Sequence, residues 1–260
     1  MTDSIYADPL PEAPLEDCHF YHTLDLPGIG TVTGMWDLRG SFEHYTNGYD
    51  FSGKRVLDIG TGSGFLSFSA EAAGAREVVS FDMDTSYRQD FLPFRDSVQY
   101  RDRDGFAERH NAKIRQWHNA YWLAHSRLGS RAKAYYGDVY DLPAALGQFD
   151  VAIVGSILEH LADPVKALAS VARRTDGAML IVTPMLDTDE PIARFMGHRE
   201  HPAKNHAFWT YSRGTFYHVL GMLGFEMTEI SQRSFHSVTG GNELKRRYVI
   251  TAERPGNGVG

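Results

Sequence analysis

The sequence predicts an α/β fold: one doubly wound, Rossmann-like domain with a mostly parallel sheet of seven strands. Two observations predict it. Short β-prone runs alternate with helical segments, and the first run leads into a glycine-rich turn that opens a helix. The length of 260 residues suits one such domain with a substantial core. We therefore expect a single domain over residues 19–254, with flexible tails over 1–18 and 255–260.

The first half of the sheet is expected from a strand, helix, strand unit of parallel type. Arg55–Ile59 is a short apolar run that ends at a glycine, and Glu77–Phe81 is a second buried strand. Between them, an apolar stripe predicts a helix through Phe65, Phe68 and Ala72.

The second half repeats this rhythm, with strands expected at Ala132–Tyr136, Val151–Gly155 and Ala178–Thr183. Before the last of these, Asp163 and Pro164 suit the N-cap and first position of a helix, and we expect Gly177 to end it. A further helix and a terminal antiparallel strand pair are expected at Ser212–Leu223, Phe225–Ile230 and Arg247–Thr251.

Two segments exceed what a minimal fold of this kind needs. Residues 19–51 are rich in aromatic residues and glycines without a long helical period, and we expect an ordered N-terminal aromatic cap. Residues 83–131 are longer than a strand-to-strand crossover requires, and apolar side chains recur there at helical spacing. The second segment therefore predicts an inserted helical lobe.

Composition excludes several classes of protein. The formal net charge is −7, which repels a polyanion and makes nucleic acid an improbable partner. No apolar stretch is long enough for a membrane span, and no signal peptide pattern is present, so we expect a cytoplasmic protein. The single cysteine, Cys18, rules out an internal disulfide.

The glycine-rich turn after the first strand carries the functional signal. Gly60, Gly62 and Gly64 alternate, which permits a tight turn and a close ligand approach to a helix N-terminus. This spacing departs from the dinucleotide fingerprint. Asp58 would repel a pyrophosphate but suits a cationic amino group. Asp82, at the end of the second strand, is placed to accept hydrogen bonds from ribose hydroxyls. Adenosine joined to an amino acid satisfies both carboxylates.

These residues resemble the class I S-adenosylmethionine-dependent methyltransferases over roughly residues 55–183, so S-adenosylmethionine is the expected cofactor. The resemblance implies that the three glycines line the methionine and ribose and that Asp82 holds the ribose. It also implies that Met83 packs on the adenine, with the Asp138 carboxylate and the Val139 amide at the edge of the ring. We add Thr61 and Ser156 to the expected cofactor contacts.

The flanking segments at residues 20–27, 35–39 and 208–210 resemble a branch related to the wobble-uridine tRNA methyltransferases. The net charge and the lack of a clear basic face depart from a dedicated tRNA binder. A small-molecule acceptor methylated on oxygen or nitrogen is therefore the favoured hypothesis. A tRNA-modifying enzyme and an enzyme using the cofactor for another reaction, such as intramolecular cyclisation, are the alternatives.

His160 is the candidate catalytic base, because it follows the fourth strand, where class I methyltransferases face donor toward acceptor, and histidine titrates near neutral pH. A structural histidine is the alternative. Glu159 and His160 also resemble a divalent-metal site of some quinone O-methyltransferases. Ser156 replaces a carboxylate of that site, so we expect no metal.

Several aromatic and basic residues are candidates for closing over the acceptor, because aromatic faces attract a sulfonium cation. They are Tyr21, His22, Trp36, Arg39 and Trp209. Plain packing explains the cap residues about as well. A loop holding His198, His201 and His206 precedes Trp209, and we interpret it as a solvated substrate lid; a metal cluster is the alternative.

Overall fold

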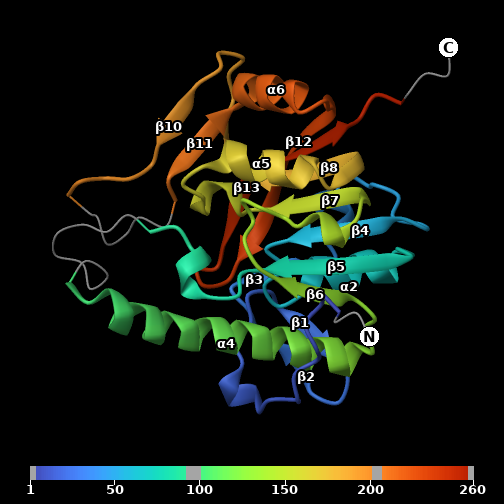
Figure 1. Cartoon of the computed structure of the whole chain (residues 1–260), viewed down its shortest axis with the longest axis vertical. Coiled ribbons are helices and arrows are strands. Elements are labelled where there is room, and N and C mark those ends of the chain that lie inside the picture. The colour runs from blue at the N-terminus through green and yellow to red at the C-terminus, as the bar shows by residue number, and fades with distance from the viewer. Residues whose placement is uncertain (1–3, 92–100, 201–206, 257–260) are drawn as a thin grey trace.

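The computed structural model describes residues 4–91, 101–200 and 207–256. Within them the main sheet has eight strands in the order β3-β12-β13-β8-β7-β4-β5-β6 (Figure 1). Its parallel part comprises β4 (Arg55–Ile59), β5 (Glu77–Asp82), β6 (Lys133–Tyr136), β7 (Phe149–Gly155) and β8 (Thr175–Thr183). Its antiparallel end comprises β13 (Glu243–Glu253), β12 (Glu226–Ser237) and β3 (Trp36–Asp37). The predicted fold class is confirmed.

The eighth strand comes from the N-terminal cap and was not predicted. β3 pairs antiparallel with the end of β12, with Trp36 opposite Ser237 and Asp37 opposite His236. Two residues are too few for a recognisable alternating pattern, so only the tertiary pairing makes this segment a strand. The terminal pair β12 and β13 is also longer than expected, because it continues well beyond the rest of the sheet.

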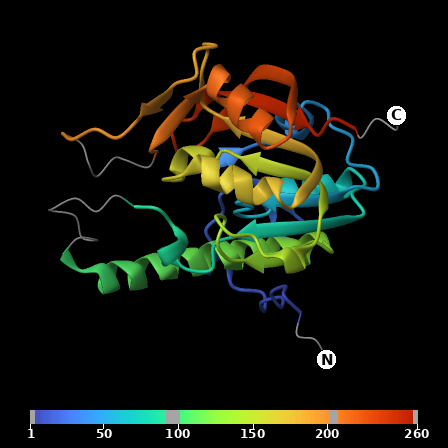
Figure 2. The same ribbon diagram turned by 45° about the horizontal axis from the view of Figure 1, so that its top comes forward.

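Helices cover both faces of the sheet, and each face has its own apolar core. Successive residues of β4 alternate between the two cores, with Val56 in one and Leu57 in the other, as a strand buried on both faces requires. Figure 2 shows α5 and α6 on one side and α4 on the other. The first core includes α1 (Phe42–Tyr45), α2 (Phe65–Ala72) and α4 (Arg103–Leu128). The second includes α5 (Pro164–Ala172) and α6 (Arg213–Met222).

The predicted helix starts agree with the structure. The Asp163 carboxylate accepts a hydrogen bond from the Lys166 amide at 3.0 Å, and Pro164 is the first residue of α5. The prediction that Gly177 ends this helix was wrong, because α5 ends at Ala172 and Gly177 lies within β8. Gly177 is needed there for a different reason: a Cβ would lie 2.2 Å from the Asp150 carbonyl oxygen of the neighbouring strand.

The predicted cap contains a small hairpin of β1 (Leu24–Leu26) and β2 (Gly30–Val32) besides β3 and α1. The segment before it makes contacts that the sequence analysis did not foresee. The Ala7 amide donates to the Ala134 carbonyl of β6 at 2.9 Å, and the Glu12 carboxylate bonds Ser126 and Arg127 of α4. The short 3₁₀ turn η1 (Leu15–Asp17) follows.

The crossover from β5 to β6 contains η2 (Ser86–Arg88) and α4, a helix of 26 residues that extends past the sheet at one end (Figure 1). The turns η3 (Ala144–Leu146) and η4 (Leu158–His160) flank β7. A separate small sheet contains β9 (Met185–Leu186), β10 (Ala193–Phe195) and β11 (Trp209–Ser212). In the part of the chain that the structure describes, no helix combines the length and apolarity that a membrane crossing requires.

Candidate functional site

The glycine turn between β4 and α2 has the backbone geometry that its sequence requires. Gly60, Gly62 and Gly64 have φ angles of 77°, 56° and 88°, in the left-handed region that favours glycine. A Cβ on Gly60 would lie 2.5 Å from a methyl carbon of Ile157. The Gly60 and Thr61 amides both donate to the Phe81 carbonyl, at 2.9 and 3.0 Å, which fixes the turn against β5.

Asp82 joins this turn to the end of β5. One carboxylate oxygen accepts the Gly62 N–H at 2.9 Å and the other accepts the Met83 N–H at 2.8 Å. Burial raises the pKa of Asp82, and these two backbone bonds oppose that effect. A carboxylate has about four lone-pair sites, so acceptor capacity remains for ribose hydroxyls.

Asp58 lies beneath the turn, fully buried. One of its oxygens accepts the Ser67 hydroxyl at 2.7 Å, and Ser67 also contacts Thr61 and Ser80. The other oxygen, Oδ1, has no hydrogen-bond partner among the described residues. Burial raises the pKa of Asp58 to about 6, against the lowering effect of Ser67. The Thr61 side chain therefore belongs to a buried polar network.

The loop after β6 lies beside the loop after β5. The Gly137 amide donates to the Asp82 carbonyl at 2.9 Å, which brings Asp138 and Val139 next to Met83. One Asp138 oxygen caps the following turn at the Tyr140 amide, and the other contacts the Arg88 guanidinium at 3.2 Å. The Val139 side chain is buried in the second core. The structure thus brings the predicted adenosine-binding residues together.

His118 of α4 supports the same loops and was missed by the sequence analysis. Its Nε2 lies 3.1 Å from the Met83 carbonyl oxygen, and its ring stacks on Tyr136 at a centroid distance of 3.9 Å. Burial lowers the pKa of His118, while the nearby Asp82 charge raises it. Its position on a long amphipathic helix gave no local signal that it would reach β5.

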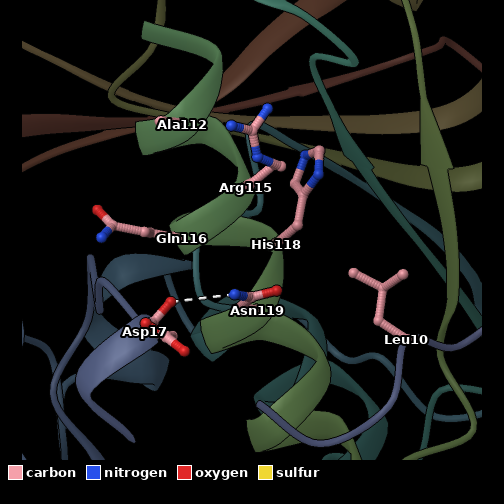
Figure 3. Close-up of a pocket in the computed structure, with 7 residues that line it drawn as sticks. All are labelled: Leu10, Asp17, Ala112, Arg115, Gln116, His118 and Asn119. Atoms are coloured by element: carbon pink, nitrogen blue, oxygen red, sulfur yellow. Dashed lines mark hydrogen bonds between the residues drawn. The ribbon is translucent and has the colours of Figure 1, made fainter. Parts of the chain in front are cut away.

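His118 also lines a cavity of about 290 Å³ on the outer side of α4 (Figure 3). The N-terminal segment contributes Leu10 and Asp17 to this cavity, and the Asn119 amide donates to the Asp17 carbonyl at 3.0 Å. The remaining lining residues come from α4: Ala112, Arg115, Gln116 and Asn119. The cavity and the end of β5 therefore share His118.

The cap lies directly over the glycine turn. A Cβ on Gly62 would lie 3.2 Å from the Tyr21 Cβ, and the His22 amide donates to the Ser63 hydroxyl at 2.8 Å. Trp36 is held to this segment because its amide donates to the Tyr21 carbonyl at 3.0 Å. Burial lowers the pKa of His22 to about 3, so its ring is neutral. Tyr21, His22 and Trp36 thus gather beside the predicted cofactor site.

The end of β7 approaches the same region. Ser156 has a φ angle of 52°, a left-handed conformation that a non-glycine residue rarely adopts. In η4, Glu159 is buried, whereas its neighbour His160 is exposed. Burial raises the pKa values of Tyr21 and Tyr45, and the negative charge of Glu159 adds to this effect. Neither Glu159 nor Tyr45 was among the predicted site residues; their burial is visible only in the folded chain.

Two predicted substrate residues have other partners in the structure. Arg39 makes ion pairs with Asp37 and Asp25 at 2.7 and 2.8 Å on the surface. Trp209 donates its indole N–H to the Ala162 carbonyl at 3.0 Å and packs on Phe195. His198 belongs to the described part of the chain, and the proposed lid residues His201 and His206 lie outside it.

The residues of the site fit S-adenosylmethionine. The unpartnered Asp58 Oδ1 is an acceptor for a cationic group, and the remaining capacity of Asp82 suits ribose hydroxyls. The three glycines give the turn the left-handed backbone that its shape requires. Within residues 4–91, 101–200 and 207–256, no group of three or more His, Cys, Asp and Glu side chains is arranged to hold a metal ion.

Comparison with known proteins agrees with this geometry. Residues 41–230 match the family described as a methyltransferase domain. The ribosomal protein L11 methyltransferase of Vibrio vulnificus strain YJ016 is 35% identical over 82 residues, 32% of this chain and 26% of that relative. That of Deinococcus radiodurans is 54% identical over 58 residues, 22% of this chain and 21% of the relative. The chain thus spans about a quarter of the length of these relatives.

Two solved structures share the fold at low sequence identity. The magnesium protoporphyrin IX methyltransferase of Synechocystis PCC 6803, with bound S-adenosylhomocysteine, has a TM-score of 0.55 at 16% identity, over 84% of this chain and 82% of that chain. The 1,6-didemethyltoxoflavin-N1-methyltransferase of Burkholderia thailandensis has a TM-score of 0.51 at 16% identity, over 82% and 76%. From the extent of the family match, this chain belongs to the methyltransferase-domain family, and it shares its fold with these two methyltransferases.

Proposed function

We propose that this chain is an S-adenosylmethionine-dependent methyltransferase that acts on a small organic acceptor, at an oxygen or nitrogen atom. The position of the cap carries the proposal. Tyr21 lies against Gly62 and the His22 amide bonds Ser63, so the N-terminal segment covers the cofactor turn. A covered site suits an acceptor that is small enough to be enclosed and shielded from water.

S-adenosylmethionine supplies a methyl group already activated by the sulfonium, so the protein mainly has to align the acceptor and exclude water. In this proposal Asp58 and the glycine turn hold the amino acid part, Asp82 holds the ribose, and Met83 and Asp138 contact the adenine. The aromatic faces of Tyr21 and Trp36 stabilise positive charge beside the turn. Ser156 closes the site from the end of β7.

Methylation of a hydroxyl or amine leaves a surplus proton, which a nearby base accepts. Two side chains of η4 are candidates. Glu159 is buried and its charge raises the pKa of the cap residue Tyr21, whereas the predicted base His160 is exposed. We favour Glu159, because a base has to lie within hydrogen-bond reach of the enclosed acceptor. His160 is the alternative, acting from the exposed side of η4.

A protein acceptor is the second candidate, because the relatives named above are ribosomal protein L11 methyltransferases. Their match covers only a fraction of those relatives, so it supports the shared cofactor-binding region more directly than a shared substrate. A tRNA acceptor and a reaction without methyl transfer are the further alternatives, and both are outcomes of the following experiment.

The experiment follows tritium from S-adenosylmethionine labelled in its methyl group. The purified protein is incubated with a cell extract divided into small molecules, protein and RNA. Label in the small-molecule fraction supports the proposal. Label confined to protein or RNA contradicts it in favour of a macromolecular acceptor. Turnover of the cofactor without any extract indicates a reaction that needs no acceptor. The Asp82→Ala variant is the control for labelling that does not depend on the site.

A further inference from the structure

Arg247 lies at the edge of the sheet where the cofactor site is built. β13 runs antiparallel to β8, and Tyr248 pairs with Thr183, the last residue of β8. Arg247 therefore lies just past the carboxyl end of the parallel strands. Its guanidinium carbon is 5.2 Å from the ring centroid of Trp36. Burial and the Glu159 charge raise the pKa of Tyr21, and the Arg247 charge lowers it.

The guanidinium of Arg247 has no carboxylate partner among the described residues. Its Nη1 donates to the backbone carbonyl of Arg246 at 3.0 Å, and its Nε is buried without a hydrogen-bond partner. Other arginines of this chain are paired: Arg39 with two aspartates and Arg213 with two more. A buried hydrogen-bond donor without an acceptor is unfavourable. Arg247 is therefore suited to bind a hydrogen-bond acceptor that a ligand supplies.

A second arginine strengthens the positive charge at this position. Arg233 of β12 stands directly opposite Arg247 in the antiparallel register, and no ion pair to Arg233 is found among the described residues. Like charges at directly opposite positions destabilise a strand pair. In a chain of net charge −7, two opposed arginines at the edge of the site therefore indicate a local role for positive charge.

We propose that Arg247 binds a carboxylate of the acceptor, and that the acceptor is an aromatic hydroxy- or amino-carboxylate. This proposal rests on the proposed function. A guanidinium binds a carboxylate through two parallel hydrogen bonds, and Trp36 beneath it supplies an apolar surface for a planar ring. The negative charges of Glu159 and Asp82 both raise the pKa of Tyr21, and such charge disfavours a doubly charged phosphate more than a singly charged carboxylate.

Calorimetry on the full chain saturated with S-adenosylhomocysteine tests the proposal, with benzoate and its neutral isostere benzamide as probes. We expect the wild type to bind benzoate and to bind benzamide at least about tenfold more weakly. Arg247→Gln removes this preference, and Arg247→Lys restores part of it because the charge returns without the planar fork. Arg246→Gln, on the exposed neighbour, is the matched control and keeps the wild-type preference.

Three results overturn the proposal: no binding of benzoate to the wild type, equal binding of benzoate and benzamide, or an unchanged preference in Arg247→Gln. Unchanged S-adenosylhomocysteine affinity in each variant shows that the fold and cofactor site are intact. The proposed function fails separately, when the label is confined to protein or RNA. A carboxylate preference that persists with a macromolecular acceptor would contradict the proposed function and leave Arg247 as an anion-binding residue.

Discussion

The Gly62 amide donates a 2.9 Å hydrogen bond to the Asp82 carboxylate, so the glycine turn and the end of β5 form one unit. We expect Asp82→Ala to weaken S-adenosylhomocysteine binding by about 100-fold or more, since charge-assisted bonds to backbone and ribose are lost together. Calorimetry measures the affinity. Asp84→Ala, which removes an exposed carboxylate paired with Arg88, is the control. Equal affinities of the two variants would show that Asp82 does not contribute to cofactor binding.

The conformation of the turn predicts a difference between two glycine substitutions. Gly60 and Gly53 both have positive φ, but a Cβ on Gly53 meets nothing within 4 Å, whereas one on Gly60 meets Ile157 at 2.5 Å. We expect Gly53→Ala to cost about 1–2 kcal/mol of unfolding free energy for the left-handed backbone alone. Gly60→Ala should cost about 1–3 kcal/mol more because of crowding. Urea denaturation checks this order, and equal losses would contradict it.

The burial of Asp58 predicts that the free energy of unfolding depends on pH. Its pKa rises from 3.8 in the unfolded chain to about 6 in the folded one. The protonated form is thus favoured by folding, and the stability it contributes is complete below pH 3.8 and lost as the pH rises through about 6. Relative to Asp58→Asn, the unfolding free energy of the wild type should fall over this window by up to about 3 kcal/mol and then stay level.

Denaturation of the wild type and Asp58→Asn without cofactor, at a series of pH values, measures this difference. Asp104→Asn, at an exposed position in the first turn of α4, controls for the removal of one charge. A constant difference between wild type and Asp58→Asn across the series would show that folding does not shift the pKa of Asp58.

Replacing His118 should weaken cofactor binding and leave the hydrophobic core intact. His118→Phe keeps a ring against Tyr136 but removes the donor at the Met83 carbonyl. We expect S-adenosylhomocysteine affinity to fall by about three- to tenfold, the value of one hydrogen bond. Gln116→Ala, in the same cavity, is the control. Fluorescence titration measures both variants, and wild-type affinity in His118→Phe would limit His118 to packing.

The two candidate bases of η4 can be separated by kinetics once an acceptor is in hand. Glu159→Gln should lower kcat by about 100-fold or more, the usual contribution of a positioned base, with cofactor affinity unchanged. His160→Asn, at the exposed neighbour, should leave kcat within a few-fold of the wild type. The reverse pattern would return the role of proton acceptor to His160.

The fold could be predicted because its signals are local. The apolar run of β4, the glycine turn and the caps at Asp163 and Ser212 each depend on a few neighbouring residues. The errors concern long-range contacts. Gly177 was taken as a helix end because glycine is common there, whereas its real constraint is the backbone of the adjacent strand. The edge strand β3 likewise exists only through its pairing with β12.

The residues of the candidate site also fall into two groups, those that local sequence signals identified and those that depend on long-range contacts. Asp58, Asp82 and the glycines stand in a motif whose spacing implies a turn and a ligand, so sequence alone named them. Tyr45, His118 and Glu159 could not be ranked, because each acts through burial against an element distant in the chain. Arg39 shows the opposite case, since its surface ion pairs are invisible in the sequence.

The bonds from residues 7 and 12 to β6 and α4 have a practical consequence for handling the protein. A chain shortened to begin at the cap would lack the N-terminal segment that bonds α4. It would also lack Leu10 and Asp17, which line the cavity beside His118. An affinity tag placed at the carboxyl end avoids that disturbance.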